Sequence, residues 1–147
     1  ETSLMSSRSN FFKSLTNLFM LTLTVPILLG QSVLAQESIE FTAEQVANGE
    51  AIYKETCQIC HGSRLSNGQF GTPLRGSFFK NTWKGKTLGA LVQNTYEKMP
   101  PDNVMSMPMQ QYAEVISFIL SRNEIEPGDT PVEGHLETLN LIPLPWQ

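Results

Sequence analysis

Apolar and polar positions along the chain fall into one long apolar stretch near the start, three segments with helical periodicity, and polar connections between them. In segments 42–56, 87–98 and 108–122 the apolar residues recur every three to four positions, which predicts three amphipathic helices. Period-two alternation, the sign of a half-buried strand, is weak everywhere. The pattern therefore predicts a small all-α domain with about three core helices and long loops.

The first predicted helix carries a start signal and an internal glycine. Thr42 with Gln45 three residues later forms a capping box, whose side chains satisfy backbone N–H groups that the first turn leaves free. Gly49 lies on the apolar face, where a glycine costs about 1 kcal/mol relative to alanine. Its lack of a side chain predicts close approach by a second helix. The predicted inner face comprises Val46, Gly49, Ile52 and Tyr53.

Prolines bound the second and third predicted helices. The second begins at Thr87 and ends by Lys98 or Met99, because the residue before Pro100 is disfavoured in helical backbone. The third begins near Pro108, a favourable first-turn residue, and ends at about Arg122. The predicted inner faces comprise Leu88, Leu91, Val92 and Tyr96 in the second helix, and Tyr112, Val115, Ile116, Ile119 and Leu120 in the third.

Two further segments are predicted to lack regular structure. Segment 62–86 is rich in Gly, Ser, Asn and Pro, and a loop of that length in a compact domain normally wraps around something. Its interleaved apolar residues are suited to cover a flat cofactor, and they are Phe70, Leu74, Phe78, Phe79 and Trp83. Segment 127–147 is broken by prolines, glycines and acidic residues. It predicts an extension that trails from the domain or packs on it through Leu136, Leu139 and Leu141.

The apolar stretch near the start is typical of a secretory leader. Arg8 and Lys13 precede it, and Val33 and Ala35 occupy the −3 and −1 positions of a cleavage site. A bilayer-spanning helix needs roughly 20 apolar residues, so the run is short for a transmembrane anchor. We expect residues 1–35 to be a signal peptide, 36–126 a folded domain and 127–147 its extension. An uncleaved membrane anchor is the alternative.

Composition bears on partners and compartment. The chain has a formal net charge of −4, which makes it a poor candidate for binding nucleic acid. An acidic surface instead favours a protein partner with a basic docking patch. The leader predicts export to the periplasm, where two cysteines would ordinarily suggest one disulfide.

The two cysteines lie in the run Cys57-Gln58-Ile59-Cys60-His61. Two thiols one helical turn apart can add to the vinyl groups of one haem, and the following histidine then supplies an axial ligand to iron. Three alternatives use the same residues. A redox-active thiol pair would need a βαβ context, a zinc site would need a further ligand such as His135, and a structural disulfide would leave His61 without a role. We expect one covalently bound haem c.

Between about Phe41 and Arg122 the chain carries Gly49, Tyr53, Cys57-x-x-Cys60-His61-Gly62, Gly71-Thr72-Pro73-Leu74-x-Gly76, Trp83, Tyr96-x-x-Met99-Pro100-Pro101 and the segment 112–123. With these features it resembles a class I cytochrome c domain. Within the class, the chain most resembles the small monohaem cytochromes that serve quinoprotein alcohol dehydrogenases. The resemblance implies a cytochrome c-like fold wrapped around one haem.

The resemblance also implies Met99 as the sixth ligand of the iron, because the family's ligand lies in a Met-Pro step after the second helix. A thioether favours Fe(II), which suits an electron carrier. Met107 also precedes a proline and is the competing ligand. His135, or an open sixth site, is a further alternative.

Three supporting residues complete the expected site. The resemblance implies that the Pro73 carbonyl accepts a hydrogen bond from the free ring nitrogen of His61 and so orients the imidazole. Trp83 and Arg75 carry N–H donors suited to the haem propionates.

These features predict a periplasmic electron carrier and not an enzyme. It would accept single electrons from a dehydrogenase, with a quinoprotein alcohol dehydrogenase as one candidate, and pass them to a cytochrome oxidase or another cytochrome. One alternative is a fixed cytochrome subunit of a dehydrogenase complex. Another is a sensor or peroxidase with an open sixth site. Membrane contact is expected only with an uncleaved leader.

Overall fold

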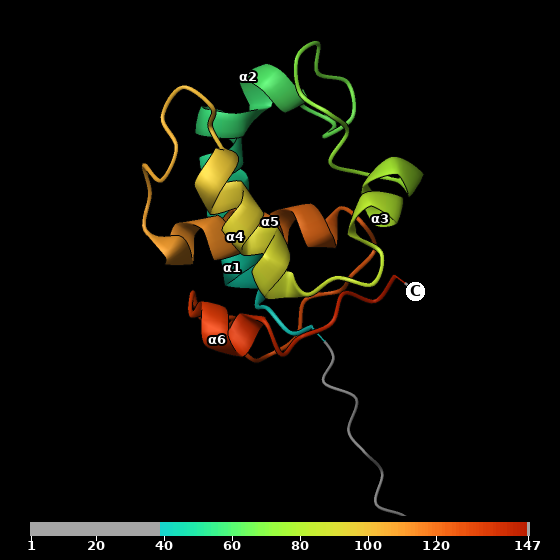
Figure 1. Cartoon of the computed structure of the whole chain (residues 1–147), viewed down its shortest axis with the longest axis vertical. Coiled ribbons are helices and arrows are strands. Elements are labelled where there is room, and N and C mark those ends of the chain that lie inside the picture. Colours follow the sequence, from blue (N-terminus) through green and yellow to red (C-terminus); the bar gives the residue numbers. More distant parts are fainter. Residues whose placement is uncertain (1–38, 147) are drawn as a thin grey trace, which may run out of the picture. The chain divides into compact units, whose positions relative to one another are not determined.

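The computed structural model describes residues 39–146, and the predicted leader lies outside this range. Its helices are α1 (Ala43–Ile52), the π-helical turn η1 (Tyr53–Cys57), α2 (Gln58–His61), α3 (Ser77–Trp83), α4 (Leu88–Lys98), α5 (Met109–Ser121) and α6 (Leu136–Leu139). Residues 39–146 form no strand, only isolated bridges between Thr42 and Gly128 and between Thr87 and Pro143. The all-α prediction is confirmed, as Figure 1 shows. No helix of this range is both long and apolar enough to cross a membrane.

Helix α1 begins at the predicted capping box. The Gln45 N–H donates to the Thr42 hydroxyl, and the Thr42 N–H donates to the Gln45 side-chain oxygen, both at 3.2 Å. The Gln45 amide has a second partner, because it also pairs with the backbone N–H and C=O of Val132. The start of α1 is therefore tied to the C-terminal extension, 87 residues further along the chain.

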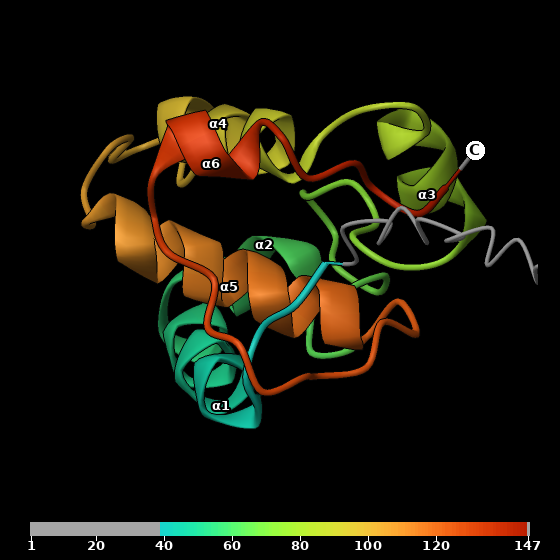
Figure 2. The same cartoon turned by 90° about the horizontal axis from the view of Figure 1, so that it is seen from below.

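Helices α1 and α5 cross at Gly49, and Figure 2 shows α5 running across α1. A Cβ on Gly49 would overlap the backbone carbonyl of Glu114, so only glycine permits this approach. One turn later, Tyr53 is fully buried and its ring centroid lies 5.3 Å from that of Phe118. The close helix approach predicted from Gly49 is confirmed.

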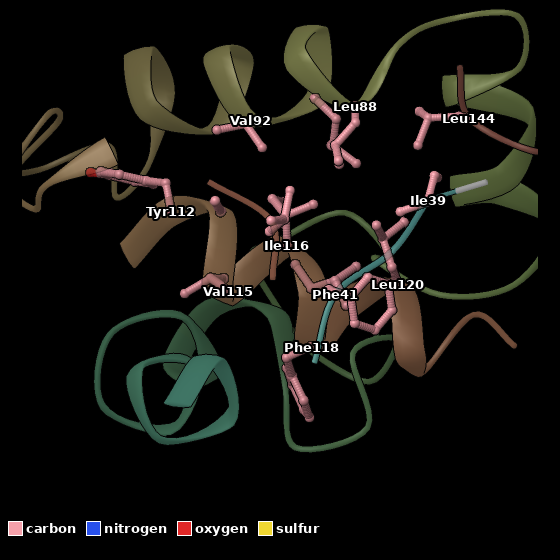
Figure 3. Close-up of a cluster of buried hydrophobic side chains, with 14 of the residues drawn as sticks. Ile39, Phe41, Leu88, Val92, Tyr112, Val115, Ile116, Phe118, Leu120 and Leu144 are labelled. Carbon is pink, nitrogen blue, oxygen red and sulfur yellow. The ribbon is translucent and has the colours of Figure 1, made fainter. Parts of the chain in front are cut away.

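Helix α5 contributes the largest part of the hydrophobic core (Figure 3). Each fully buried aliphatic side chain contributes about 1.5–3 kcal/mol to folding. Helix α4 faces α5 and begins at Thr87 as predicted, where the Thr87 hydroxyl accepts from the Ala90 N–H. The buried residues are Leu88, Gly89, Leu91 and Val92 on α4, and Tyr112, Ala113, Val115, Ile116, Ser117, Phe118, Ile119 and Leu120 on α5.

Segment 62–86 is not the continuous loop that its composition predicts, because residues 77–83 form α3. Gly76 precedes this helix with φ at +80°, and its N–H donates to the Asn123 side-chain oxygen at 3.0 Å. Phe79 and Trp83, four residues apart, are the buried residues of α3. The periodicity of a two-turn helix flanked by glycines is too short to be recognised in the sequence.

The C-terminal extension packs against the domain. Leu139 and Leu144 are buried, whereas Leu141 is 70 % exposed. The prediction that Leu141 packs on the domain is therefore wrong. The reason is that α6 ends at Leu139 and a turn follows, in which the Ile142 N–H donates to the Leu139 carbonyl.

Beyond α6 the extension runs along the connection between α3 and α4. Backbone hydrogen bonds link Gly85 to Trp146, Leu144 to Lys86 and Leu88 to Ile142 at 2.9–3.0 Å. The Trp146 ring then meets the Phe79 ring edge to face, with 5.6 Å between centroids. The extension thus holds both α3 and the start of α4.

Candidate functional site

A cavity lies between α2, α3, α4, α5 and the loops that join them. Its volume is about 260 Å³, many times the roughly 10–15 Å³ that a cavity needs to hold one water molecule, so it has room for a ligand. Its lining is mostly apolar. The lining residues are Thr56, Cys57, Cys60, His61, Thr72, Pro73, Leu74, Phe78, Phe79, Thr82, Trp83, Lys86, Leu91, Asn94, Thr95, Met99, Pro100, Pro101, Met107, Tyr112, Val115, Ile116 and Ile119.

The C-x-x-C-H residues come from the end of a continuous helical path. Cys57 is the last residue of η1, and Cys60 and His61 end α2. The buried Tyr53 hydroxyl donates to the carbonyl of Gly62 at 2.7 Å, which ties the end of α2 back to the start of η1. Local widening of an α-helix into a π-turn is frequent at functional sites.

The His61 ring is held by backbone on the far side of the following loop. Its Nδ1 lies 2.8 Å from the carbonyl oxygen of Thr72. Because a carbonyl only accepts, Nδ1 carries the proton and Nε2 is left free as a ligand atom. Gly71 lies against the ring, where a Cβ would come within 2.5 Å of Nδ1.

The prediction that the Pro73 carbonyl accepts from His61 is wrong by one residue, because the Thr72 carbonyl takes that place. The Gly71 N–H donates to the Cys60 carbonyl at 2.9 Å, and this bond sets the register of the loop against α2. In that register the carbonyl preceding Pro73 faces the ring. Pro73 itself lines the cavity.

Both methionines that compete for the sixth position line the same cavity. Met99 follows α4 in extended backbone, at φ −130° and ψ 141°. Met107 lies in the loop before α5. His135 is exposed at the start of α6 and is not among the lining residues, so the structure does not bring it to this site.

The Cys57 thiol is not a low-pKa nucleophile. Burial is the larger cause and the nearby Cys60 the smaller cause of a rise in the pKa of Cys57 to about 11. A thiol of that pKa is protonated at neutral pH, unlike the reactive cysteine of a redox C-x-x-C pair. Residues 39–146 also contain no group of three His, Cys, Asp or Glu side chains placed to hold a metal ion. Neither the redox-pair nor the zinc alternative gains support from this geometry.

Trp83 and Arg75 differ in position. Trp83 is buried in the cavity wall, whereas Arg75 is exposed and is not a lining residue. The charge of Arg75 lies near Glu124, whose pKa is lowered mainly by a hydrogen bond from Lys80 and less by Arg75. The cation that does reach the cavity is Lys86, whose Nζ lies 4.8 Å from the Trp83 ring centroid.

The lining residues fit a covalently attached haem. Two thiols and an imidazole with a free Nε2 occupy one part of the cavity, and thioether sulfurs are available in the same cavity. Apolar side chains from α3, α4 and α5 supply walls for a flat hydrophobic group. Glycine at position 71 leaves the room in which the His61 ring lies.

Sequence reasoning missed Thr72, Lys86 and Tyr112 as site residues. Tyr112 was predicted only as a core residue. It is the one residue with a polar tip on an otherwise aliphatic predicted face, and a buried hydroxyl normally needs a partner. That partner is the Met99 carbonyl, at 2.9 Å. The carbonyl of Thr72 has no signal in the sequence, because any residue carries one.

The family described as cytochrome C oxidase, cbb3-type, subunit III matches residues 44–119. The match runs from the first turn of α1 into the last turns of α5 and includes every residue that lines the cavity. The C-terminal extension lies outside it. No curated protein and no solved structure matches the chain.

Proposed function

The chain belongs to the cytochrome c domain family described as cytochrome C oxidase, cbb3-type, subunit III, and we propose that it is a periplasmic one-electron carrier. Family membership together with the C-x-x-C-H cysteines implies one covalently bound haem c with its iron. When bound, the haem supplies reversible one-electron chemistry, and the protein tunes it through ligands, hydrogen bonds and burial.

Four side chains of this chain are proposed to hold the group. Cys57 and Cys60 form the covalent attachments, and His61 offers Nε2 because Nδ1 is engaged by Thr72. Met99 provides the thioether, with Met107 as the competing donor. The observation that carries the proposal is that one cavity brings the two thiols, the imidazole and these thioethers together.

The cavity walls favour electron transfer over bond-making chemistry. Their apolar side chains, among them Phe79, Leu91 and Ile116, would keep water away from a bound haem. Among the lining residues of the described chain, Lys86 is the charged side chain and no carboxylate is present. A general acid–base pair of the kind that hydrolytic or peroxidatic chemistry uses is not assembled by these residues.

Charge near the cavity differs from the charge of the whole chain. Between Glu55 and Glu97 the sequence has no acidic residue and five basic ones: Arg64, Arg75, Lys80, Lys84 and Lys86. The net charge predicts a partner with a basic patch. This basic segment, however, supplies much of the cavity lining and favours a partner with an acidic patch. We therefore propose that the electron donor, with a quinoprotein alcohol dehydrogenase among the candidates, presents acidic groups to the α3 side.

Location outside the cytoplasm is part of the same proposal. It is supported by the charged start, apolar run and small-residue exit of segment 1–35. Export would bring the C-x-x-C-H motif to the compartment in which haem is attached.

A second candidate is a fixed subunit of a larger respiratory or dehydrogenase complex. The description of the matching family, which names an oxidase subunit, favours it. Purification of the untagged chain from its native membranes and soluble fraction separates the two functions. Recovery as a single free chain supports the carrier, and stable co-purification with a catalytic chain supports the subunit.

The cofactor is tested by intact mass and a pyridine haemochrome spectrum of the exported protein. One added haem mass and a spectrum typical of two thioether bonds are expected, and the mass also fixes the leader cleavage site. Cys57→Ser combined with Cys60→Ser should remove the covalent haem. A mass without haem in the wild-type protein would overturn the proposal.

The ligand set is tested with paired methionine variants. Met99→Ala should lose the far-red sulfur–iron absorption band of the ferric protein and gain carbon monoxide binding in the ferrous one. Met107→Ala should keep the band and bind no carbon monoxide. The reverse pattern would assign Met107, and carbon monoxide binding by the wild-type protein at neutral pH would indicate an open sixth site.

A further inference from the structure

Tyr112 on α5 is buried to 1 % exposure and reaches the backbone of the proposed ligand residue. Its hydroxyl donates to the Met99 carbonyl oxygen at 2.9 Å. The ring also lines the cavity. Tyr112 therefore contacts both the site and the chain segment that delivers the sulfur.

The backbone of Met99 is fixed from two sides. Its N–H donates to the Thr95 carbonyl at 2.8 Å, which continues α4 by one bond. Its carbonyl is held by Tyr112, which belongs to α5. Because side-chain direction depends on backbone conformation, these two hydrogen bonds fix the position and direction from which the Met99 side chain leaves the backbone.

The Tyr112 ring is itself held in place. It meets the Tyr96 ring of α4 edge to face, at 5.4 Å between centroids and 85° between planes. Tyr96 and Met99 lie on the same short stretch of chain at the end of α4. The aromatic pair and the hydroxyl thus fasten that stretch to α5 at two points.

We infer that Tyr112 is a positioning residue for the Met99 ligand, an inference that rests on the proposed His61 and Met99 ligation. The hydroxyl keeps the Met99 backbone in the conformation that presents sulfur to the iron. Without it the Met99 carbonyl loses its partner in a part-buried contact, and the segment gains freedom to move away. Competing ligands then displace the sulfur more readily.

Tyr112→Phe tests this inference because it removes one oxygen and keeps the ring. Loss of one hydrogen bond of ordinary strength should make imidazole bind to the ferric holoprotein about fivefold more tightly. The far-red sulfur–iron band should weaken, and the reduction potential should fall because the thioether favours Fe(II). Covalent haem content and helicity should stay at the wild-type level.

Tyr96→Phe is the matched control, since it removes the other hydroxyl of the same aromatic pair and leaves the bond to Met99 intact. It should match the wild-type protein in imidazole affinity, band and potential. If Tyr112→Phe behaves like Tyr96→Phe while Met99→Ala loses the band, the positioning role is wrong and the ligation stands. If Met99→Ala keeps the band, the ligation itself is wrong.

A measurement on the unaltered holoprotein supplements the variants. The Tyr112 hydroxyl proton should give a slowly exchanging NMR resonance with a nuclear Overhauser contact to Met99. Rapid exchange of that proton with water would overturn the inference even if the variants did not accumulate.

Discussion

The Cα of Gly49 on α1 lies directly against the backbone carbonyl of Glu114 on α5. Glu114 precedes Val115 and Ile116, both of which line the cavity. The contact therefore sets the distance between α1 and the part of the cavity wall that α5 forms. The crossing also brings Tyr53 onto Phe118, one turn further along each helix. Its effect on stability can be measured directly.

Gly49→Ala should destabilise the holoprotein by at least about 2 kcal/mol, because the new methyl group would collide with backbone and not with a flexible side chain. Gly128→Ala is the control. Its Cβ would come no closer than 3.7 Å to the Glu40 side chain, and its effect should stay within about 1 kcal/mol of zero. Equal denaturation midpoints for the two variants would contradict the close crossing.

Gly71→Ala should perturb the proximal side of the haem. The added methyl group would lie 2.5 Å from His61 Nδ1 and must tilt the ring or displace the loop, at a cost of about 1–3 kcal/mol. We expect a lower yield of holoprotein and a changed reduction potential. Gln69→Ala, an exposed position two residues earlier, should change neither quantity.

Tyr53 should make the folded protein sensitive to alkali. Burial, the larger cause, and the Cys57 sulfur raise the pKa of Tyr53 from 10.0 to about 12, and the burial persists once the thiol is part of a thioether. The unfolded chain therefore releases this proton first, and stability falls as the pH rises from about 10 toward 12. Denaturant titrations of the holoprotein at pH 8, 10 and 11 would measure the loss. Tyr53→Phe should show a shallower decline, and parallel curves would contradict the assignment.

Two leucines of the extension offer a matched pair. Leu144 is fully buried and Leu141 is 70 % exposed. Leu144→Ala should lower the free energy of unfolding by about 2–4 kcal/mol, whereas Leu141→Ala should change it by less than about 0.5 kcal/mol. Similar losses for both would mean that the extension does not pack as described.

The basic segment beside the cavity predicts a charge preference in electron transfer. An anionic oxidant such as ferricyanide should react with the reduced protein faster at low ionic strength than at high. Lys86→Gln should slow that reaction by about two- to threefold. Lys54→Gln is the control, since Lys54 lies on η1 and pairs with Glu50. A cationic oxidant should show the opposite trend, and identical salt dependence for both oxidants would exclude a local basic field.

The sequence was sufficient for features that are encoded locally. The capping box of Thr42 and Gln45, the start of α4 at Thr87 and the proline that ends α4 depend on residues within one or two turns. Gly49 was also interpretable, because a glycine on an apolar helical face has few reasons to be there except close packing. The C-x-x-C-H run is also encoded locally, and it indicates a covalently bound haem without any knowledge of the fold.

Features that depend on distant backbone could not be predicted. The second partner of Gln45 is the backbone of Val132, and the partner of His61 is the carbonyl of Thr72 instead of Pro73. Helix α3 is recognisable only once Phe79 and Trp83 have something to pack against, which includes Trp146. Leu141 and Leu144 are alike in the sequence and differ only through the turn that follows α6.

The contact between Trp146 and Phe79 also has a consequence in time. Trp146 comes near the end of the chain and does not line the cavity, so in an exported chain that is still folding the two thiols are available to haem before Trp146 has docked. Until it docks, α3 lacks its contact with the C-terminal extension, and the cavity wall beside Trp83 is free to move. We expect haem to be attached while this side is open, and docking of Trp146 to close it afterwards.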